Sequence, residues 1–459
     1  MQSNHKTTSG TLHVPAFIST PPIPSIISEW SAIFPLVCHL ANYGDDHHMV
    51  GELALAGHLT VGLFPKLGYL SGISRLLQGG TDFFDRANAQ GASGSGKVWD
   101  VNWGSVFTPA NGSAMHIITK YALRRQRETM DMPEEVLAEP DRLPGVAAAA
   151  AASGHSPQAK GPPKIHFRRH QELHIIRISR TNHARSMRGT ALSMFVTRSG
   201  EVAYHLMLVG VIALLGLLGA FGSAAVLLNG LLSKLACRLL RTERPPGYLE
   251  SNENHDACML SAIHENAITW HLYVGDRGLI DWLLNKTMLS NPPQGRIQIV
   301  FFRLAHIAQL LAMTFVAAQK GIDGVCLVIL LMINYGSQYL LGGYKMARQW
   351  LEAEHISVDA SSFRFSGRTA MIGAIHTISQ ARDAEWMTSL IVPCPRITVW
   401  LDELKCNAEM RAQVDRDTRR LSSSDRAWVL LNSQLAIQAG RLIGAKLSEG
   451  KTTESLYLK

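Results

Sequence analysis

Charged side chains are scarce in this chain. Asp, Glu, Lys and Arg make up 17% of its 459 residues, whereas soluble domains average about 25%. Apolar residues make up 46% of the sequence. This balance disfavours an entirely soluble protein and is typical of a chain with part of its length in lipid. The net charge of +8 then points to an anionic membrane surface before nucleic acid.

Cysteine is scarce, and a secretory leader is not expected. The six cysteines are scattered without a CxxC pair, which does not fit a disulfide framework. Residues 1–25 are polar and rich in Ser, Thr and Pro, without the apolar core of a signal peptide. We therefore expect that insertion into a membrane uses an internal segment as its signal.

No motif for catalysis or metal binding is complete. Residues 91–97 match most of a phosphate-binding loop, but Val98 replaces the hydroxyl that should hold magnesium. His264 and His271 would lie about 10 Å apart along a helix, too far to bind one zinc ion. We therefore expect no metal site and no cofactor, and an enzyme is the less favoured interpretation.

Three segments are apolar enough to span a bilayer. Residues 202–233 run 32 positions without a formal charge, and a bilayer core of roughly 30 Å needs about 20 residues. Residues 297–344 contain two apolar stretches joined by the short connection 319–323, which predicts a helical hairpin. Two weaker stretches lie within 26–80, so up to five spanning helices are expected.

Two arrangements of 202–233 are open. Four basic residues precede the segment and four follow it, so charge does not orient a single span. A hairpin turning near 219–222 would keep both flanks on one side, but broken backbone in lipid is costly. We therefore favour one long tilted span, with residues 81–201 luminal or external. On this view Asn111, which lies in a sequon, is glycosylated.

The predicted fold class is mainly α: an integral membrane helical protein with three firm transmembrane helices and a soluble helical C-terminal domain. Within 234–296, Met259, Ile263, Ala267 and Trp270 recur at helical spacing, and Asp276 is expected to cap a following helix. The expected segments are a disordered N-terminus (1–25), two moderately apolar helices (26–80), a mixed soluble segment (81–128), a disordered linker (129–163), a basic juxtamembrane segment (164–201), a transmembrane helix (202–233), amphipathic and soluble helices (234–296), a transmembrane hairpin (297–344) and the helical domain (345–459).

Residues 164–198 hold eight Lys or Arg residues. Binding to single-stranded nucleic acid relies on stacking aromatics, which this segment nearly lacks. Its position beside an apolar segment favours anionic lipid head groups, at about 1 kcal/mol per basic residue near the surface. The expected partners are therefore the bilayer and anionic lipid, with no nucleic acid, and the sequence does not specify protein partners.

Four polar residues of the predicted hairpin are candidates for an intramembrane site. Ionisable and amide side chains inside a membrane are functional candidates by default, and the four are Arg303, His306, Asn334 and Gln338. The structural alternative is that Arg303 extends to the interface and that the two amides bond to a neighbouring helix. The sequence alone favours this structural alternative.

The stretch 270–288, WHLYVGDRGLIDWLLNKTM, is followed by an apolar hairpin. This combination resembles uncharacterised multi-pass membrane proteins of filamentous fungi over the middle third of the chain. The resemblance implies a multi-pass helical membrane protein and no particular chemistry. Our first hypothesis is therefore a non-enzymatic membrane protein that anchors or organises partners. The alternative is a membrane-bound enzyme or small-molecule carrier that uses the polar residues of the hairpin.

Overall fold

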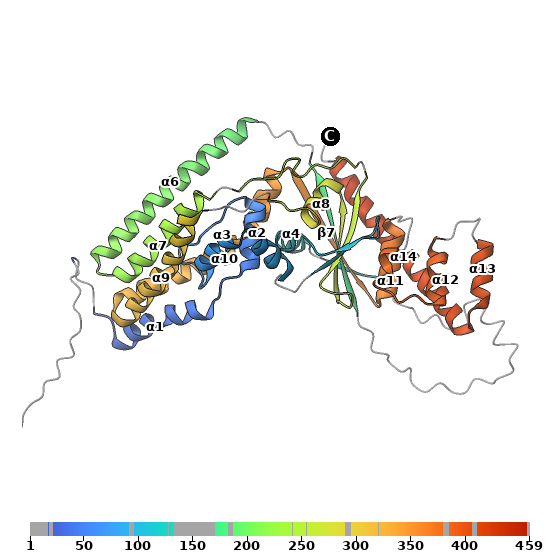
Figure 1. Ribbon diagram of the computed structural model, residues 1–459, viewed down its shortest axis with the longest axis horizontal. Helices are drawn as coiled ribbons and strands as arrows, with labels where there is room; N and C mark the ends of the chain where they lie inside the picture. The colour runs from blue at the N-terminus through green and yellow to red at the C-terminus, as the bar shows by residue number, and fades with distance from the viewer. Residues whose placement is uncertain are drawn as a thin grey trace, which may run out of the picture.

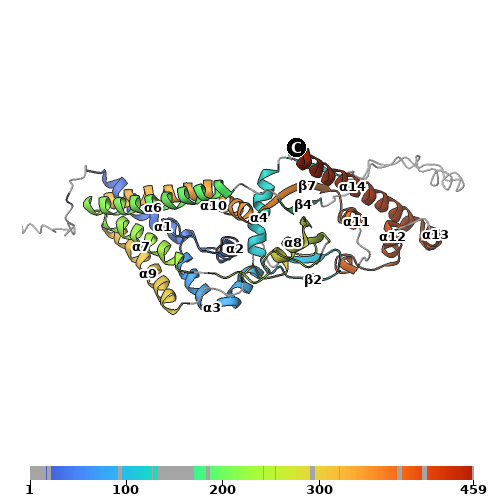
Figure 2. The ribbon, with the colours of Figure 1, turned by 90° about the horizontal axis from the view of Figure 1, so that it is seen from above.

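The computed structural model is an elongated molecule, with a helical bundle at one end and a helix-covered sheet toward the other (Figures 1 and 2). Most described residues are helical, as predicted, but a seven-stranded sheet is also present. Most of the predicted N-terminus (1–25) and linker (129–163) lies outside the described residues. The structure describes residues 17, 22–90, 96–126, 128–132, 170–181, 187–240, 242–253, 255–289, 295–319, 321–379, 385–405 and 411–456.

The sheet gathers segments that lie far apart in the sequence. Its order is β2-β1-β5-β6-β4-β7-β3, with parallel pairs β4–β6 and β3–β7 and antiparallel pairs elsewhere. The strands are β1 (Lys97–Asp100), β2 (Val106–Phe107), β3 (Thr129–Asp131), β4 (Gln171–Arg180), β5 (Ala257–Ala262), β6 (Thr269–Gly275) and β7 (Ile356–Phe365).

Several predictions for these segments are wrong. Residues 234–296 contain β5 and β6 where helices are predicted, and the predicted helical domain 345–459 contains β7. All six residues of β5 are buried because helices cover both faces of the sheet. A strand covered in this way carries a continuous apolar run, and such a run also satisfies the spacing of one helix face.

The predicted basic juxtamembrane segment 164–201 also contains a central strand, β4. Its apolar residues face both covering layers, with Leu173 on one side and Ile176 on the other. Its basic residues are engaged within the protein: Arg177 donates to the Leu447 carbonyl at 3.2 Å, and Arg180 lies 3.0 Å from the Asp276 carboxylate. These two residues therefore have partners within the protein, while 164–169, 182–186 and the side chains of 187–199 lie outside the described residues, so lipid binding by this segment stays a prediction.

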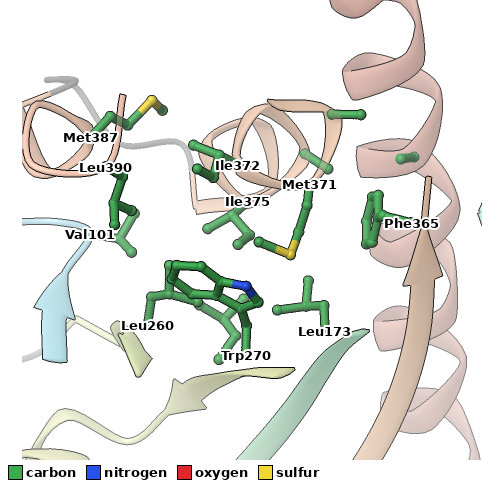
Figure 3. Close-up of a cluster of buried hydrophobic side chains, with 14 of the residues drawn as sticks. Val101, Leu173, Leu260, Trp270, Phe365, Met371, Ile372, Ile375, Met387 and Leu390 are labelled. Carbon is green, nitrogen blue, oxygen red and sulfur yellow. The ribbon is translucent and has the colours of Figure 1, made fainter. Parts of the chain in front are cut away.

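Helices pack on both faces of the sheet. On one face, Met371, Ile372 and Ile375 of α11 lie over Leu173 and Trp270 (Figure 3). Each fully buried large apolar side chain contributes about 1.5–3 kcal/mol, so this cluster stabilises the sheet strongly. The helices of this layer are α11 (Arg368–Ser379), η2 (Glu385–Met387), α12 (Pro395–Lys405) and α14 (Ser423–Leu456), with α13 (Arg411–Arg420) beside α12. The opposite face is covered by α4 (Gly112–Arg125) and α8 (Arg277–Leu284).

Asp276 caps α8, as the sequence predicts, because its carboxylate accepts the Leu279 N–H at 3.0 Å.

Five described helices form the bundle, in which α1 packs on α9 and α10 while α7 packs on α6 and α9. These helices are α1 (Ser25–Ala41), α6 (Met187–Leu217), α7 (Phe221–Arg238), α9 (Arg296–Gln319) and α10 (Ile322–Ala353). Between bundle and sheet lie α2 (Asp46–Ala56) and α3 (Tyr69–Gln90).

The predicted hairpin over 297–344 is present as α9 and α10, but α10 is longer than predicted. Its last turns leave the bundle, and Ala347, Trp350 and Leu351 are buried in the core of the sheet. One continuous helix therefore joins the apolar bundle to the sheet, which fixes the position of one part against the other (Figure 1).

The segment 202–233 is a helical hairpin and not the single long span that we favour from the sequence. Helix α6 ends at Leu217, and α7 begins at Phe221. Between them Gly219 has a φ of +77°, a left-handed conformation that glycine adopts without steric cost. The break in the backbone is tolerated because its polar groups are paired within the protein, as in the 2.9 Å bond from the Ala220 N–H to the Leu215 carbonyl.

Asp323, in the first turn of α10, closes the α6–α7 turn. Its two carboxylate oxygens accept the N–H groups of Gly222 and Ser223, each at 2.8 Å. The Ser223 hydroxyl also donates to the Asp323 carbonyl at 2.8 Å. The first N–H groups of a helix have no partner within the helix, and they carry partial positive charge. Buried Asp323 therefore satisfies the start of α7 and ties the two hairpins together at their turns.

The sheet contains strands from before the α6–α7 hairpin, from between it and the α9–α10 hairpin, and from after the α9–α10 hairpin. Strand β1 pairs with β5, and β4 pairs with β6, so both ends of the α6–α7 hairpin return to the sheet. The predicted separation of residues 81–201 from residues 245–296 by a membrane is therefore wrong. Any layer that surrounds the bundle has the whole sheet on one side.

We expect Asp323→Ala to destabilise the bundle, because the buried N–H groups of Gly222 and Ser223 lose their acceptor. A buried donor left unpaired costs about 1–3 kcal/mol, so a loss of this order per group should lower the thermal unfolding midpoint of the detergent-purified protein. Asp359→Ala is the control, since Asp359 is exposed on β7. Equal midpoints for the two variants would contradict the capping role.

Candidate functional site

The helices of the bundle expose many large apolar side chains. Two of its helices, over Gly200–Leu217 and Arg296–Gln319, are long and apolar enough to cross a membrane, and only 11% and 28% of these windows are buried. An extended exposed apolar surface marks a site of membrane or protein interaction. Most exposed large hydrophobic residues lie on the bundle, for example Trp30, Leu206, Leu228, Ile297, Leu311 and Met332.

A non-helical loop enters this bundle between α2 and α3. Residues 57–68, here called the inserted loop, place Phe64 among apolar side chains of α7, α9 and α10, where it is 4% exposed. The backbone of Leu63 approaches α7 so closely that a Cβ on Gly230 would lie 2.7 Å from its carbonyl oxygen. The prediction of two apolar helices within 26–80 is thus correct for α1, whereas the second stretch is interrupted by this loop.

Buried amides pair the main chain of the inserted loop. Asn334 of α10 donates to the Phe64 carbonyl at 3.1 Å and accepts the Phe64 N–H at 3.4 Å. Gln309 of α9 donates to the Pro65 carbonyl at 2.8 Å. Irregular backbone inside an apolar layer needs such partners, because no water replaces them. Sequence reasoning found Asn334 but missed Gln309, although a lone amide in an apolar helix is a usable signal.

The predicted candidates in the hairpin do not converge on one site. Arg303 is exposed and contacts α3, with Nε 3.2 Å from the Ser74 hydroxyl and a second nitrogen 2.5 Å from the Gln78 amide oxygen. His306 is half-buried and faces α1, while Asn334 holds the inserted loop. The side chain of Gln338 lies outside the described residues.

A recess adjoins the inserted loop, but it is too narrow to admit a water molecule. Among the described residues, His39 stands out there because both of its ring nitrogens are buried without a hydrogen-bond partner. As it stands, the recess does not hold a substrate. It is lined by His39, Asn42, Phe64, Lys66, Asn334 and Tyr335.

Glu52 of α2 is a largely buried carboxyl beside the loop, with 13% of its side chain exposed. One carboxylate oxygen lies 3.3 Å from both the Thr60 hydroxyl and the Tyr69 hydroxyl, and the other lies 3.4 Å from Nδ1 of His48. Burial raises the pKa of Glu52 to about 7, although hydrogen bonds from Thr60 and Tyr69 act against that shift. A carboxyl that titrates near neutral pH can accept or release a proton, and such groups cluster at functional sites. Sequence reasoning missed it.

Two motifs weighed in the sequence are structural here. Lys97, at the end of the phosphate-loop-like stretch, pairs with Glu265, and residues 91–95 lie outside the described residues. His264 lies in the β5–β6 connection and His271 on β6, not on one helix. Among the described residues, no group of three or more His, Cys, Asp or Glu side chains is placed to hold a metal ion.

The predicted glycosylation of Asn111 does not fit the structure. Asn111 is 4% exposed, and its amide nitrogen donates to the carbonyls of Trp282 and Lys286 at 2.8 and 2.6 Å. A glycan would have to attach to this buried nitrogen and would remove one of its two N–H donors. Asn111 instead joins α4 to the end of α8.

No protein-family model, curated protein or solved structure matches this chain. The resemblance to fungal membrane proteins therefore stays a prediction. The function has to be argued from the residues themselves.

We expect the Glu52 carboxyl to make stability depend on pH. The folded protein keeps this proton up to about pH 7, whereas an unfolded chain releases it near 4.5. Since the folded state then binds more protons, stability falls as the pH rises from about 4.5 to 7. Glu52→Gln removes this loss. At pH 5 the variant should unfold at nearly the same temperature as wild type. At pH 8 its free energy of unfolding should exceed that of wild type by on the order of 2–3 kcal/mol, so it should unfold at a higher temperature.

The matched control for this experiment is Glu128→Gln, because Glu128 is exposed. This control should follow wild type at both pH values. A Glu52→Gln effect of the same size at pH 5 and pH 8 would show that burial does not shift this carboxyl.

We expect Asn334→Leu to destabilise the bundle far more than Arg303→Leu. The first change leaves both main-chain groups of Phe64 unpaired in an apolar interior, at about 1–3 kcal/mol each. Arg303 and Gln78 are exposed, and buried Ser74 keeps its bond to the Ile299 carbonyl at 3.1 Å. Limited proteolysis within residues 57–68 and thermal unfolding would measure the difference. Similar behaviour of the two variants would rule out the assigned role of Asn334.

Proposed function

We propose that the bundle is inserted in a lipid bilayer and anchors the helix-covered sheet at one membrane face, where the protein organises partners without catalysing a reaction. The observation that carries this proposal is the distribution of exposed apolar side chains. They gather on helices α1, α6, α7, α9 and α10, while the covering helices of the sheet bury theirs in its core. Lipid is the environment that matches such a surface.

The α6–α7 hairpin has the dimensions of a re-entrant element. Helix α7 rises about 20–25 Å from its start to Lys234 and Arg238, less than the roughly 30 Å of a bilayer core. Its turn is apolar, with Leu217 and Phe221 exposed. A turn that stays inside lipid must have its backbone paired by protein, and Asp323 does so. This supports the re-entrant alternative of the sequence analysis.

Charge orients the proposed insertion. Helices α7, α9 and α10 each have one end toward the sheet. Exposed basic side chains lie near these ends, among them Arg238, Arg296 and Lys345. Positive charge beside spans tends to stay in the cytosol, so the sheet faces the cytosol. Helix α1 begins at the opposite end, because Phe17 bonds to the Leu217 carbonyl at 3.1 Å beside the α6–α7 turn.

The organising role is favoured over catalysis or transport because the buried amides of the bundle hold the inserted loop. The second candidate function is a membrane-bound enzyme or small-molecule carrier, and the Glu52 cluster beside the recess favours it. That function requires the inserted loop to move, since the recess has no room for a water molecule. Solute flux in vesicles reconstituted with wild type, and lost in Glu52→Gln, would establish it; its absence would leave the organising role.

We expect the protein to stay in the membrane fraction after alkaline carbonate extraction, because lipid covers its apolar helices. Asn111→Gln should migrate as wild type does, before and after endoglycosidase treatment. Release by carbonate would contradict the proposed insertion.

A further inference from the structure

We propose that the sheet-facing end of α7, together with the adjoining parts of α6 and α10, forms a binding site for the phosphate of an anionic lipid head group. The site consists of Tyr204, Lys234, Arg238 and Lys345, here called the basic cluster. This inference rests on the proposed insertion into a bilayer and adds a ligand class to it.

The charges of the basic cluster are not balanced within the protein. Arg238 pairs with Glu201 at 2.9 Å, and Glu201 is the one acid that acts on Lys234 among the described groups around it. The ammonium of Lys234 is repelled by Arg238 and by Lys345 of the neighbouring hairpin. Three cations against one carboxylate leave a local excess of positive charge. A phosphate oxyanion placed among them would remove the repulsion and gain charge-assisted hydrogen bonds.

The position of the cluster matches the head-group level of a membrane. Helix α7 ends here at Arg238, with exposed Leu232 and Leu235 on the bundle side and exposed Leu239 directly after it. The Lys234 ammonium stands 4.4 Å from the centre of the Tyr204 ring on α6. Tyrosine and long basic side chains are both typical of this interface, because each has an apolar stem and a polar end.

Two separate hairpins supply the cations, since Lys234 and Arg238 belong to α7 and Lys345 to α10. A head group bound between them would therefore link the hairpins at the sheet-facing end, as Asp323 links them at the turns. The residues 170–181 of the segment from which the sequence predicts lipid binding are part of the sheet. The basic cluster is a different set of residues that faces the lipid.

The test uses the full-length protein in detergent with equal amounts of phosphatidylglycerol and phosphatidylcholine, and native mass spectrometry counts the retained lipid. Wild type should retain phosphatidylglycerol preferentially. The double variant Lys234→Gln/Lys345→Gln should bind it on the order of tenfold more weakly. Lys234→Arg/Lys345→Arg keeps both charges and should bind as wild type does. Arg419→Gln/Arg420→Gln, on α13, removes two charges far from the bundle and should change nothing.

Equal retention of the two lipids by wild type would overturn the inference, and so would wild-type binding by the Lys→Gln double variant. Displacement of the lipid by millimolar inorganic phosphate would show a site for free phosphate and would also overturn it. If the Lys→Gln variant fails to fold, binding by the Lys→Arg variant and its loss in high salt decide the question. Carbonate extraction of wild type is scored separately, so a failure of insertion is distinguished from a failure of lipid selectivity.

Discussion

The carboxylate of Asp323 accepts the first N–H groups of α7, and the arrangement of the bundle depends on that interaction. A chain that turns inside an apolar layer exposes backbone donors that water cannot reach. Asp323 meets this requirement from a second hairpin, so the α6–α7 turn is stable only where the start of α10 stands beside it. The cost of burying the carboxylate is offset by its hydrogen bonds from Gly222 and Ser223.

The same requirement explains the polar residues deeper in the bundle. Asn334 and Gln309 pair the main chain of the inserted loop, which in turn fills the space between α7, α9 and α10 with Phe64. Polar side chains that suggest a substrate path in the sequence thus hydrogen-bond to the main chain in the folded protein. Glu52 differs from them because its neighbours are side chains: the hydroxyls of Thr60 and Tyr69 and the imidazole of His48. Burial raises the pKa of Glu52 to about 7.

Sequence patterns predict the helices α1, α9 and α10 and the cap at Asp276, because each depends on neighbouring residues. They fail for the sheet. The basic residues of β4 favour a surface segment over a strand. The apolar residues of β5 and β6 fit a helical spacing because both faces of these strands are buried. The turn at Gly219 is visible in the sequence only as the less favoured alternative. Its compensating acceptor lies 101 positions from Gly222, and that pairing exists only in the folded chain. Glu52 is missed for the same reason, since Thr60 and Tyr69 become its partners only when the inserted loop folds back.

In the proposed arrangement, the chain before and after the α6–α7 hairpin lies on one side of a membrane. Ser105, in the β1–β2 connection, and Asn252, between α7 and β5, are both exposed and lie on opposite sides of that hairpin in the sequence. Ser105→Cys and Asn252→Cys variants are treated with a membrane-impermeant maleimide in sealed vesicles of each orientation, with the wild-type chain as the blank. Both sites should react only in vesicles that expose the cytosolic face. Reaction of one site in each orientation would show that 202–233 is a single span and would contradict it.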